Sequence, residues 1–267
     1  MKGYNCIIWG YGKDYETYIN AVRLQEIYGN IKVIGITAFQ GLEIKRLDGY
    51  RFIYKEELTT TNFDYLIVAS VSKFLEIRKQ VIELGIDEGK ILAIKIFALP
   101  DLDLEKYISI KNSKISIFAN CCWGGLTYNK LGMEFYSPFI NMFESCDEYL
   151  QFLEKPREYM EAPVEFVKYA PTLNRVYPVC NLNGMYLHFN HYNSYIQALE
   201  LWNKRKERIN WDNLFIMMQT EDKREADKFL SLPYERKICF VPFKTEEKDL
   251  FYVDYHKFVW GRCLSGK

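Results

Sequence analysis

Short apolar runs alternate with amphipathic stretches over the first hundred residues. The run at 4–10 ends at Gly10-Tyr11-Gly12, and a helix-like stretch at 14–28 follows it. Runs that stay apolar on both faces are typical of parallel strands between helices. The pattern therefore predicts an α/β fold built on a parallel sheet, whose further strands are expected at 31–38, 50–54, 64–70 and 91–97.

The same kind of pattern begins again after Leu99-Pro100 and the acidic stretch that follows it. A predicted strand at 115–119 leads into 120–125, and residues 176–190 fit either one strand or a hairpin about Asn183-Gly184. Further strands are expected at 214–219 and 237–241, with a helix at 222–230 between them. We therefore predict a Rossmann-like domain at 1–110 and a second α/β domain at 111–267.

Two helix starts in the second domain carry a capping signature. Ser145 is followed three residues later by Glu148, and Ser194 by Gln197, which is the spacing of a capping box. The second helix is expected to run to about Ile209. Its predicted inward stripe is Ile196, Leu199 and Trp202.

Charge and length narrow the class of protein. The chain has 267 residues, with 35 Lys plus Arg against 35 Asp plus Glu, so no net field attracts nucleic acid or an anionic membrane. No apolar run approaches the roughly 18 residues of a membrane span, and no signal peptide is recognisable. We expect a cytoplasmic protein whose seven cysteines are reduced.

The first turn partly matches a dinucleotide-binding fingerprint. Gly10 and Gly12 between a strand and a helix are candidates for holding a phosphate-bearing cofactor. However, Tyr15 stands where the third glycine belongs, and Thr37-Ala38 stands where an acidic residue would bind the ribose. The cofactor is therefore unknown and NAD is not expected; the alternative is that both glycines only form a tight turn.

The first half resembles the Rossmann-like domains at the front of several bacterial sugar-modifying and polysaccharide-biosynthesis proteins. The likeness covers about residues 4–98 and is one of pattern, including Val33-Ile34-Gly35-Ile36 and Tyr65-Leu66-Ile67-Val68-Ala69.

Five separated motifs, in order, carry a second likeness over about residues 114–255. They are Asn120-Cys121-Cys122-Trp123-Gly124-Gly125, Ser137-Pro138-Phe139-Ile140-Asn141-Met142-Phe143, Tyr177-Pro178-Val179, His188-Phe189-Asn190-His191-Tyr192 and the run 202–210. With them the chain resembles a bacterial domain of unknown function that is often labelled exopolysaccharide biosynthesis protein. The resemblance implies a pathway and no reaction chemistry.

A thiol near a helix start is the first catalytic candidate. The positive end of a helix favours thiolate, so Cys122 could act as a nucleophile with His188 or His191 as its base. Buried packing of the cysteine is the competing interpretation. No metal site is expected, because the two histidines would point to opposite faces of a strand and no Cys-x-x-Cys pattern is present.

An anion site is the second candidate. The backbone amides of Gly124 and Gly125 could bind phosphate, and Arg205 and Arg208 could grip a diphosphate if they face that turn. A solvated helix end is the alternative for the arginines. Asn213 could orient the ligand or serve only in a turn, and we include the flanking Asn120 and Trp123 among the substrate-binding residues.

These residues lead to two hypotheses. The first is a transferase in surface polysaccharide biosynthesis that binds a sugar nucleotide or a phosphorylated glycan intermediate; a metal-dependent glycosyltransferase is not expected, because no convincing Asp-x-Asp is present. The second is a non-catalytic subunit that binds a nucleotide or sugar nucleotide and docks a pathway enzyme. A third, an NAD-dependent oxidoreductase, would require stabilisation by NAD, which we expect to be absent. We expect no nucleic-acid partner and no membrane span.

Overall fold

The structure is a computed structural model that describes residues 3–38 and 44–254. Residues 255–267, which the sequence assigns to the second domain, lie outside this part of the chain. The described residues form two compact units. Unit 1 extends to Asn112 and includes Asn129–Met133, and unit 2 comprises Ser113–Tyr128 and the residues from Glu134 onward.

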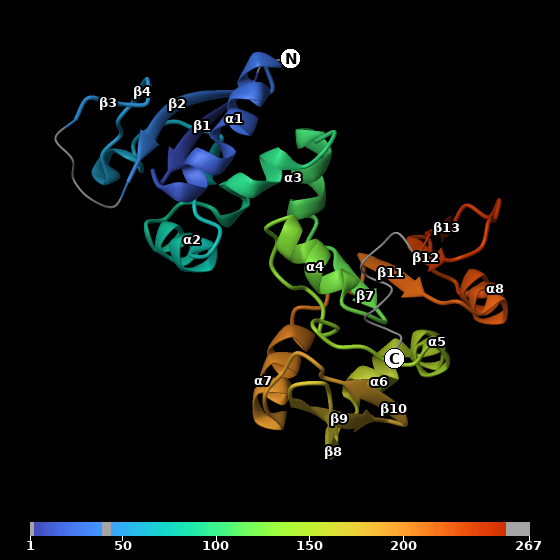
Figure 1. Cartoon of the computed structure of the whole chain (residues 1–267). Coiled ribbons are helices and arrows are strands. Elements are labelled where there is room, and N and C mark those ends of the chain that lie inside the picture. Colours follow the sequence, from blue (N-terminus) through green and yellow to red (C-terminus); the bar gives the residue numbers. More distant parts are fainter. Residues whose placement is uncertain (1–2, 39–43, 255–267) are drawn as a thin grey trace. The chain divides into compact units, whose positions relative to one another are not determined.

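Unit 1 alternates strands with helices in chain order, as Figure 1 shows. Its elements are β1 (Tyr4–Trp9), α1 (Lys13–Ile27), β2 (Ile31–Thr37), β3 (Arg46–Leu47), β4 (Tyr50–Arg51), η1 (Lys55–Glu57), β5 (Tyr65–Val68), α2 (Phe74–Glu83), η2 (Glu88–Lys90), β6 (Ile91–Ala93), η3 (Ile94–Ala98) and α3 (Leu104–Asn112).

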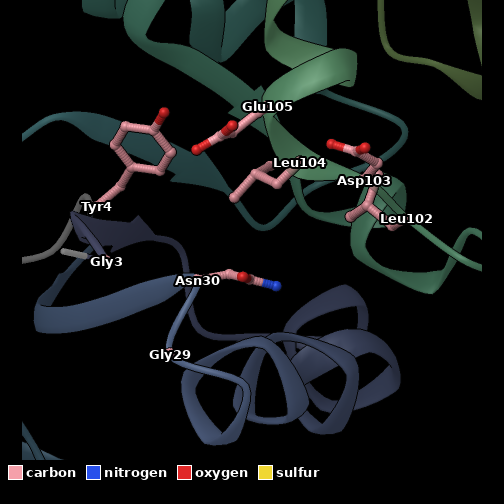
Figure 2. Close-up of a pocket in the computed structure, with 8 residues that line it drawn as sticks. All are labelled: Gly3, Tyr4, Gly29, Asn30, Leu102, Asp103, Leu104 and Glu105. Atoms are coloured by element: carbon pink, nitrogen blue, oxygen red, sulfur yellow. The ribbon is translucent and has the colours of Figure 1, made fainter. Parts of the chain in front are cut away.

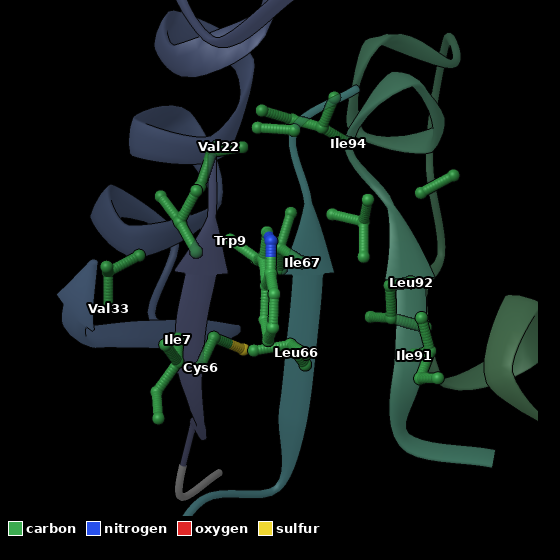
Figure 3. Packing of buried hydrophobic residues seen from close by; sticks show 14 of the residues in the cluster. Cys6, Ile7, Trp9, Val22, Val33, Leu66, Ile67, Ile91, Leu92 and Ile94 are labelled. Carbon is green, nitrogen blue, oxygen red and sulfur yellow. The ribbon is translucent and has the colours of Figure 1, made fainter. Parts of the chain in front are cut away.

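The main sheet of unit 1 is parallel, with the strand order β2-β1-β5-β6. The central strands β1 and β5 are apolar on both faces and are buried, which confirms the predicted parallel sheet with a Rossmann-like arrangement. Figure 3 shows side chains from the four strands of this sheet, from α1 and from η3 packed together. The labelled members of this core are Cys6, Ile7, Trp9, Val22, Val33, Leu66, Ile67, Ile91, Leu92 and Ile94.

Two predicted strands of unit 1 are shorter than the apolar runs suggested. The run 91–97 begins as β6 and then turns into the short helix η3, in which Ile94, Ile96 and Phe97 remain buried. The run 50–54 contributes β4, which pairs with β3 in an antiparallel ribbon, and an isolated parallel bridge between Phe52 and Ile36 of β2. An apolar run indicates that its side chains are buried but does not distinguish a strand from a short helix, because either can bury them.

Unit 2 places a long excursion between two neighbouring strands of its sheet. Its elements are β7 (Ser116–Ala119), α4 (Trp123–Lys130), α5 (Cys146–Glu154), α6 (Pro156–Glu161), β8 (Val164–Pro171), β9 (Val176–Leu182), β10 (Met185–His188), α7 (Tyr195–Lys206), β11 (Leu214–Gln219), α8 (Lys223–Ser231), β12 (Lys237–Val241) and β13 (Leu250–Tyr252).

Two sheets organise unit 2. The parallel sheet has the order β13-β12-β11-β7, and the antiparallel sheet has the order β10-β9-β8 (Figure 1). All elements from α4 to α7 lie between β7 and its neighbour β11 in the sequence. After these elements the chain forms β11 directly beside β7. Because the two strands are parallel, their carboxyl ends lie side by side.

Both predicted caps and the predicted hairpin are confirmed. The Ser145 side chain accepts a hydrogen bond from the Glu148 N–H, and the Ser194 side chain accepts one from the Gln197 N–H. Asn183 and Gly184 have φ values of 50° and 95°, as the tight turn between β9 and β10 requires.

The predicted inward stripe of α7 is wrong at its first position. Ile196 is 77% exposed, whereas the buried residues of the helix are Ala198, Trp202 and Arg205. These three recur at intervals of four and three residues, so the buried stripe starts at Ala198 and includes a charged side chain. The helix also ends at Lys206, before the predicted Ile209.

Within residues 3–38 and 44–254, no helix of either unit combines the length and the apolar character that a bilayer span needs.

Candidate functional site

Asn120 joins the carboxyl ends of two parallel strands in unit 2. It follows β7 and is buried; its Oδ1 accepts from the Gln219 N–H at 2.9 Å, and its Nδ2 donates to the Gln219 carbonyl at 3.1 Å. The same amide group lies 3.4 Å from Cys146 Sγ, at the start of α5. A sequence-predicted ligand residue is therefore fully engaged in fixing the edge of the sheet.

The two glycines of α4 allow close packing. A Cβ on Gly124 would lie 3.3 Å from Ala119 Cβ, and a Cβ on Gly125 would lie 3.2 Å from Ile140 Cγ2. Both distances are tighter than ordinary van der Waals contact, so glycine lets the start of α4 approach β7 and the chain at Ile140. The preceding Trp123 stacks on Phe215 with 6.2 Å between ring centroids.

One stretch of chain, Ile140–Cys146, contacts several of the predicted site residues, and we call it the connecting segment. The Glu144 N–H donates to the Asn120 carbonyl at 3.4 Å. Further along, Cys146 Sγ donates to the Gln219 carbonyl at 3.2 Å. The end of the connecting segment is therefore attached to the carboxyl ends of β7 and β11.

The middle of the connecting segment contacts both Cys122 and His188. Cys122 Sγ lies 4.0 Å from the Met142 carbonyl. Phe143 and His188 exchange backbone hydrogen bonds of 3.2 and 3.0 Å, and their rings stack with centroids 4.5 Å apart. The segment thus brings the predicted nucleophile and one predicted base to neighbouring residues of the chain.

His188 and His191 have different surroundings. His188 is half-buried, and its Nδ1 lies 3.2 Å from the Tyr177 hydroxyl. Desolvation lowers the pKa of His188, as does the nearby charge of Lys168, while Glu148 acts in the opposite direction. His191 is exposed, and its Nδ1 lies 3.4 Å from Arg175. Within the described residues, His188 contacts the connecting segment, whereas His191 contacts Arg175.

The two arginines have partners within the protein. Arg205 is buried; its guanidinium donates to the Tyr192 hydroxyl and lies 5.0 Å from the centroid of the Phe135 ring. The Tyr192 hydroxyl in turn donates to the Ile140 carbonyl, so Arg205 supports the connecting segment indirectly. Arg205 is therefore placed against protein groups of unit 2 and has little exposed surface.

Arg208 and Asn213 also have protein partners. Arg208 forms a 2.6 Å ion pair with Glu134, and both side chains are partly exposed. Asn213 is buried; it donates to the Ser113 carbonyl at 2.8 Å and accepts from Arg236. Asn213 therefore connects the amino ends of β7 and β11, whereas Asn120 joins their carboxyl ends.

A buried carboxyl group, absent from the sequence-predicted set, lies in the connecting segment. Glu144 is 3% exposed, and within the described residues neither of its carboxyl oxygens has a hydrogen-bond partner. Burial raises the pKa of Glu144 well above its usual value, and the nearby charge of Glu148 raises it further. At neutral pH the group is therefore held towards its protonated, uncharged form.

Tyr149, on α5, lies close enough to sense the charge of this carboxyl. Its pKa is raised mainly by burial and then by the Coulombic effect of Glu144. The Tyr149 hydroxyl also has no hydrogen-bond partner within the described residues. Within that part of the chain, the two buried polar groups lack partners and interact electrostatically, so they indicate a place where a ligand or water could bind.

The cysteines around this edge do not form a recognisable metal site. Cys121 Sγ lies 4.0 Å from Gln219 Oε1, and desolvation raises the pKa of Cys146 to about 12. Across residues 3–38 and 44–254, no group of three or more His, Cys, Asp or Glu side chains is arranged to hold a metal ion.

The glycine turn of unit 1 follows β1, whose neighbours in the sheet are β2 on one side and β5 on the other. The chain adds its next strand, β2, on one side of β1 and the later strands β5 and β6 on the other side. Gly10 has a φ of 109° and packs near the Ala69 carbonyl, while Gly12 is the N-cap of α1 with open space around it. The Asp14 carboxylate, in the first turn of α1, accepts a 2.7 Å hydrogen bond from the Val71 N–H. Negative charge at this helix start opposes an anionic phosphate.

Tyr15 has a structural role in this turn. It is buried, and its hydroxyl donates to Asp48 at 2.6 Å. The residue that replaces the third glycine of the fingerprint is thus a core side chain, and its ring packs on Tyr11 with 4.7 Å between centroids.

A hollow of about 270 Å³ lies at the other end of this sheet, and Figure 2 shows the side chains around it. Tyr4 at the amino end of β1 and Gly29-Asn30 before β2 form one side, and residues 102–105 at the start of α3 form the other. Among the described residues, the lining contributes two carboxylates, Asp103 and Glu105, and no cationic side chain. This hollow is therefore unsuited to phosphate.

Comparison with known proteins finds family models that match both parts of the chain. Residues 2–92 match the model of a C2185-like N-terminal domain, and residues 93–257 match that of a domain of unknown function, DUF1919. A Haemophilus influenzae protein called "Uncharacterized protein" is 32% identical over 134 residues, which cover 49% of this chain and 63% of that relative. This match therefore spans less than two thirds of the relative's length. Because the DUF1919 match covers more than half of the residues, the chain belongs to the DUF1919 family.

Proposed function

We propose that this protein is a group transferase that acts on a phosphate-bearing sugar during the assembly of a surface polysaccharide. The observation that carries the proposal is that residues from three separate stretches of unit 2, namely 120–125, 188–192 and Arg205, reach the connecting segment. Ligands of α/β proteins bind at the carboxyl ends of parallel strands, and this segment lies at that edge of β7 and β11. The contacting residues are Asn120, Cys122, Gly125, His188 and, through Tyr192, Arg205.

The side chains here suit a transfer of a sugar from phosphate to a hydroxyl group. The acceptor oxygen bonds to the anomeric carbon while the bond from that carbon to the phosphate oxygen breaks, and the phosphate leaves with the electron pair. His188 takes the hydroxyl proton, since its lowered pKa keeps it neutral at pH 7. The protonated Glu144 donates a hydrogen bond to a ligand oxygen, and the positive end of α4 faces the leaving phosphate.

The arginines have a supporting role in this proposal. Arg205 is engaged with Tyr192 and Phe135, and Arg208 with Glu134, so neither guanidinium is assigned to the phosphate. Arg205 instead holds Tyr192 against the Ile140 carbonyl, at the start of the connecting segment. Its contribution is to the position of the segment.

A nucleotide-release assay tests the proposal. The full chain is incubated with UDP-glucose, UDP-galactose, UDP-N-acetylglucosamine and CMP-sialic acid, each with a mixture of oligosaccharide acceptors, and free UDP or CMP is measured. We expect release from at least one donor, reduced at least tenfold in Glu144→Gln and in His188→Gln. His191→Gln is the matched control and should retain activity, because His191 contacts Arg175 and lies outside the site. Equal activity in all three variants would refute the assigned roles.

A non-catalytic binding subunit is the second candidate function, and one observation favours it. Cys122 is buried, and its Sγ lies 4.0 Å from the Met142 carbonyl, so the thiol is not exposed as a nucleophile. In that case one of the same four donors would raise the melting temperature of the protein, and no UDP or CMP would be released. Neither stabilisation nor release with any of the donors would count against both functions.

A further inference from the structure

The antiparallel sheet of unit 2 has one covered edge and one open edge. On the β10 side, His188 pairs with Phe143 of the connecting segment. On the other side, β8 pairs only with β9 within the described residues, which leaves its second edge without a partner strand. β8 runs from Val164 to Pro171 and is exposed along most of its length.

The exposed part of β8 is unusually apolar for an open edge. Phe166, Val167 and Tyr169 are 43%, 44% and 46% exposed. Long apolar edge strands are templates for pairing with another chain, and proteins normally shorten or charge them. The backbone groups along this edge can therefore pair with another strand of complementary side chains.

A bulge in β8 places two oppositely charged side chains on the same face of the sheet. Phe166 pairs with Cys180 and Lys168 pairs with Val179, so Val167 is an extra residue on β8. Glu165 pairs with Asn181, two residues from Val179, and residues two apart on a strand face the same side. The side chains of Glu165 and Lys168 consequently lie on one face of the sheet.

The opposite face carries the aromatic members of the strand. Phe166 and Tyr169 pack together with 5.1 Å between ring centroids, and Phe166 also packs on Tyr195 at 5.4 Å. Opposite charges therefore share one face of β8, while large apolar side chains share the other.

We propose that two copies of this chain associate through antiparallel pairing of their β8 strands. With a twofold axis between Phe166 and Val167, Glu165 of each copy lies opposite Lys168 of the other. Val164 then lies opposite Tyr169, and Phe166 opposite Val167. The charges attract at both symmetric positions, and apolar side chains meet between them. Self-complementarity of this kind is what a twofold interface requires, which identifies the occupant of the edge as a second copy.

Charge reversal tests the pairing. Sedimentation velocity of the wild-type chain between 1 and 100 µM should show a species of twice the 31.8 kDa mass of the chain. Glu165→Lys alone, or Lys168→Glu alone, places like charges opposite each other at both symmetric positions. Each should weaken dimerisation by about tenfold or more. The double variant Glu165→Lys/Lys168→Glu should restore it.

Mixing the two single variants provides a sharper outcome. One variant then carries Lys at both positions and the other carries Glu at both, so the pairing predicts a heterodimer from two poorly dimerising proteins. The matched control is Lys79→Glu/Glu83→Lys on α2, an exposed pair outside β8 that should leave the dimer unchanged. A wild-type chain that stays monomeric at 100 µM, or a dimer insensitive to both single reversals, overturns the proposal.

Discussion

The two units each contain a strand, a turn and a helix in succession, yet the two turns are built differently. In unit 1, β1 reaches α1 through Gly10-Tyr11-Gly12, and the space around Gly12 is open. In unit 2, β7 reaches α4 through Asn120-Cys121-Cys122, and the Asn120 side chain bonds to both backbone groups of Gln219. The first turn is shaped by backbone conformation, and the second is fixed by side chains.

This difference shows that glycines near a turn can have distinct purposes. Gly10 has a φ of 109°, a conformation that residues with a Cβ rarely adopt. Gly124 and Gly125 lie within α4, where their lack of a side chain permits close packing on β7 and on the connecting segment. In the part of the chain that the structure describes, the second turn lies beside an unpartnered buried carboxyl, that of Glu144, and the first does not.

The largest expected effect that distinguishes the two regions is the pH dependence that Glu144 gives to unit 2. Because the pKa of Glu144 is raised in the folded state, its stabilising effect is complete below the unfolded pKa and is lost as the pH rises towards the folded pKa. Glu144→Gln removes this loss. The free energy of unfolding of the variant minus that of the wild type should therefore increase by up to about 1.4 kcal/mol for each pH unit above pH 5.

Urea unfolding at pH 5, 6, 7 and 8 measures this slope. Any constant offset caused by burying a glutamine amide does not alter the trend. Glu158→Gln, at an exposed carboxyl on α6, is the control whose curve should parallel that of the wild type. A pH-independent difference between Glu144→Gln and the wild type would mean that Glu144 is not held uncharged.

The next largest effect is expected at Asn120. Asn120→Ala leaves the buried backbone N–H and carbonyl of Gln219 without their side-chain partner, which should lower the free energy of unfolding by about 2–4 kcal/mol. In unit 1, Asn30→Ala removes one partly buried hydrogen bond to Gln25 and should lower it by about 1 kcal/mol. Equal losses in the two variants, measured by urea unfolding at pH 7, would contradict the contrast between the units.

The smallest effect distinguishes the two kinds of glycine. Gly125→Ala places a Cβ 3.2 Å from Ile140 Cγ2, and the overpacking should outweigh the helix propensity of alanine and lower stability by about 1–2 kcal/mol. Gly12→Ser has open space and offers a side-chain cap for α1, so a change of at most about 0.5 kcal/mol is expected. Melting temperatures of the two variants would refute the distinction if Gly12→Ser were the less stable one.

Much of the fold could be predicted from local sequence. The two serine caps and the Asn183-Gly184 turn depend on residues within four positions of each other, so the sequence contains all the information they need. The strands β1, β5 and β11 are apolar runs between turn signals. By contrast, β8 could not be predicted from the sequence. Its residues from Glu165 to Tyr169 are all exposed, so the strand lacks the usual alternation between a buried and a solvated face.

The candidate site could be predicted only in part. Its motif residues Asn120, Cys122 and His188 do reach one segment of chain. The partners of Arg205 and Arg208 could not be foreseen, because Tyr192 and Glu134 are specified by tertiary packing. Glu144 was missed because a single carboxylate before a helix cap looks like an ordinary solvated loop residue. Its burial depends on α5 and on the end of β7.

Hydrogen–deuterium exchange tests the central claim most directly, namely that the ligand site lies at the connecting segment of unit 2. The full chain is compared without and with whichever of the four tested nucleotide sugars gives the largest thermal stabilisation. Slower exchange is expected in peptides that cover Asn120–Leu126 and Ile140–Cys146. Protection confined to the Gly10–Lys13 turn of unit 1, or no protection at saturating concentrations of all four, would contradict the account.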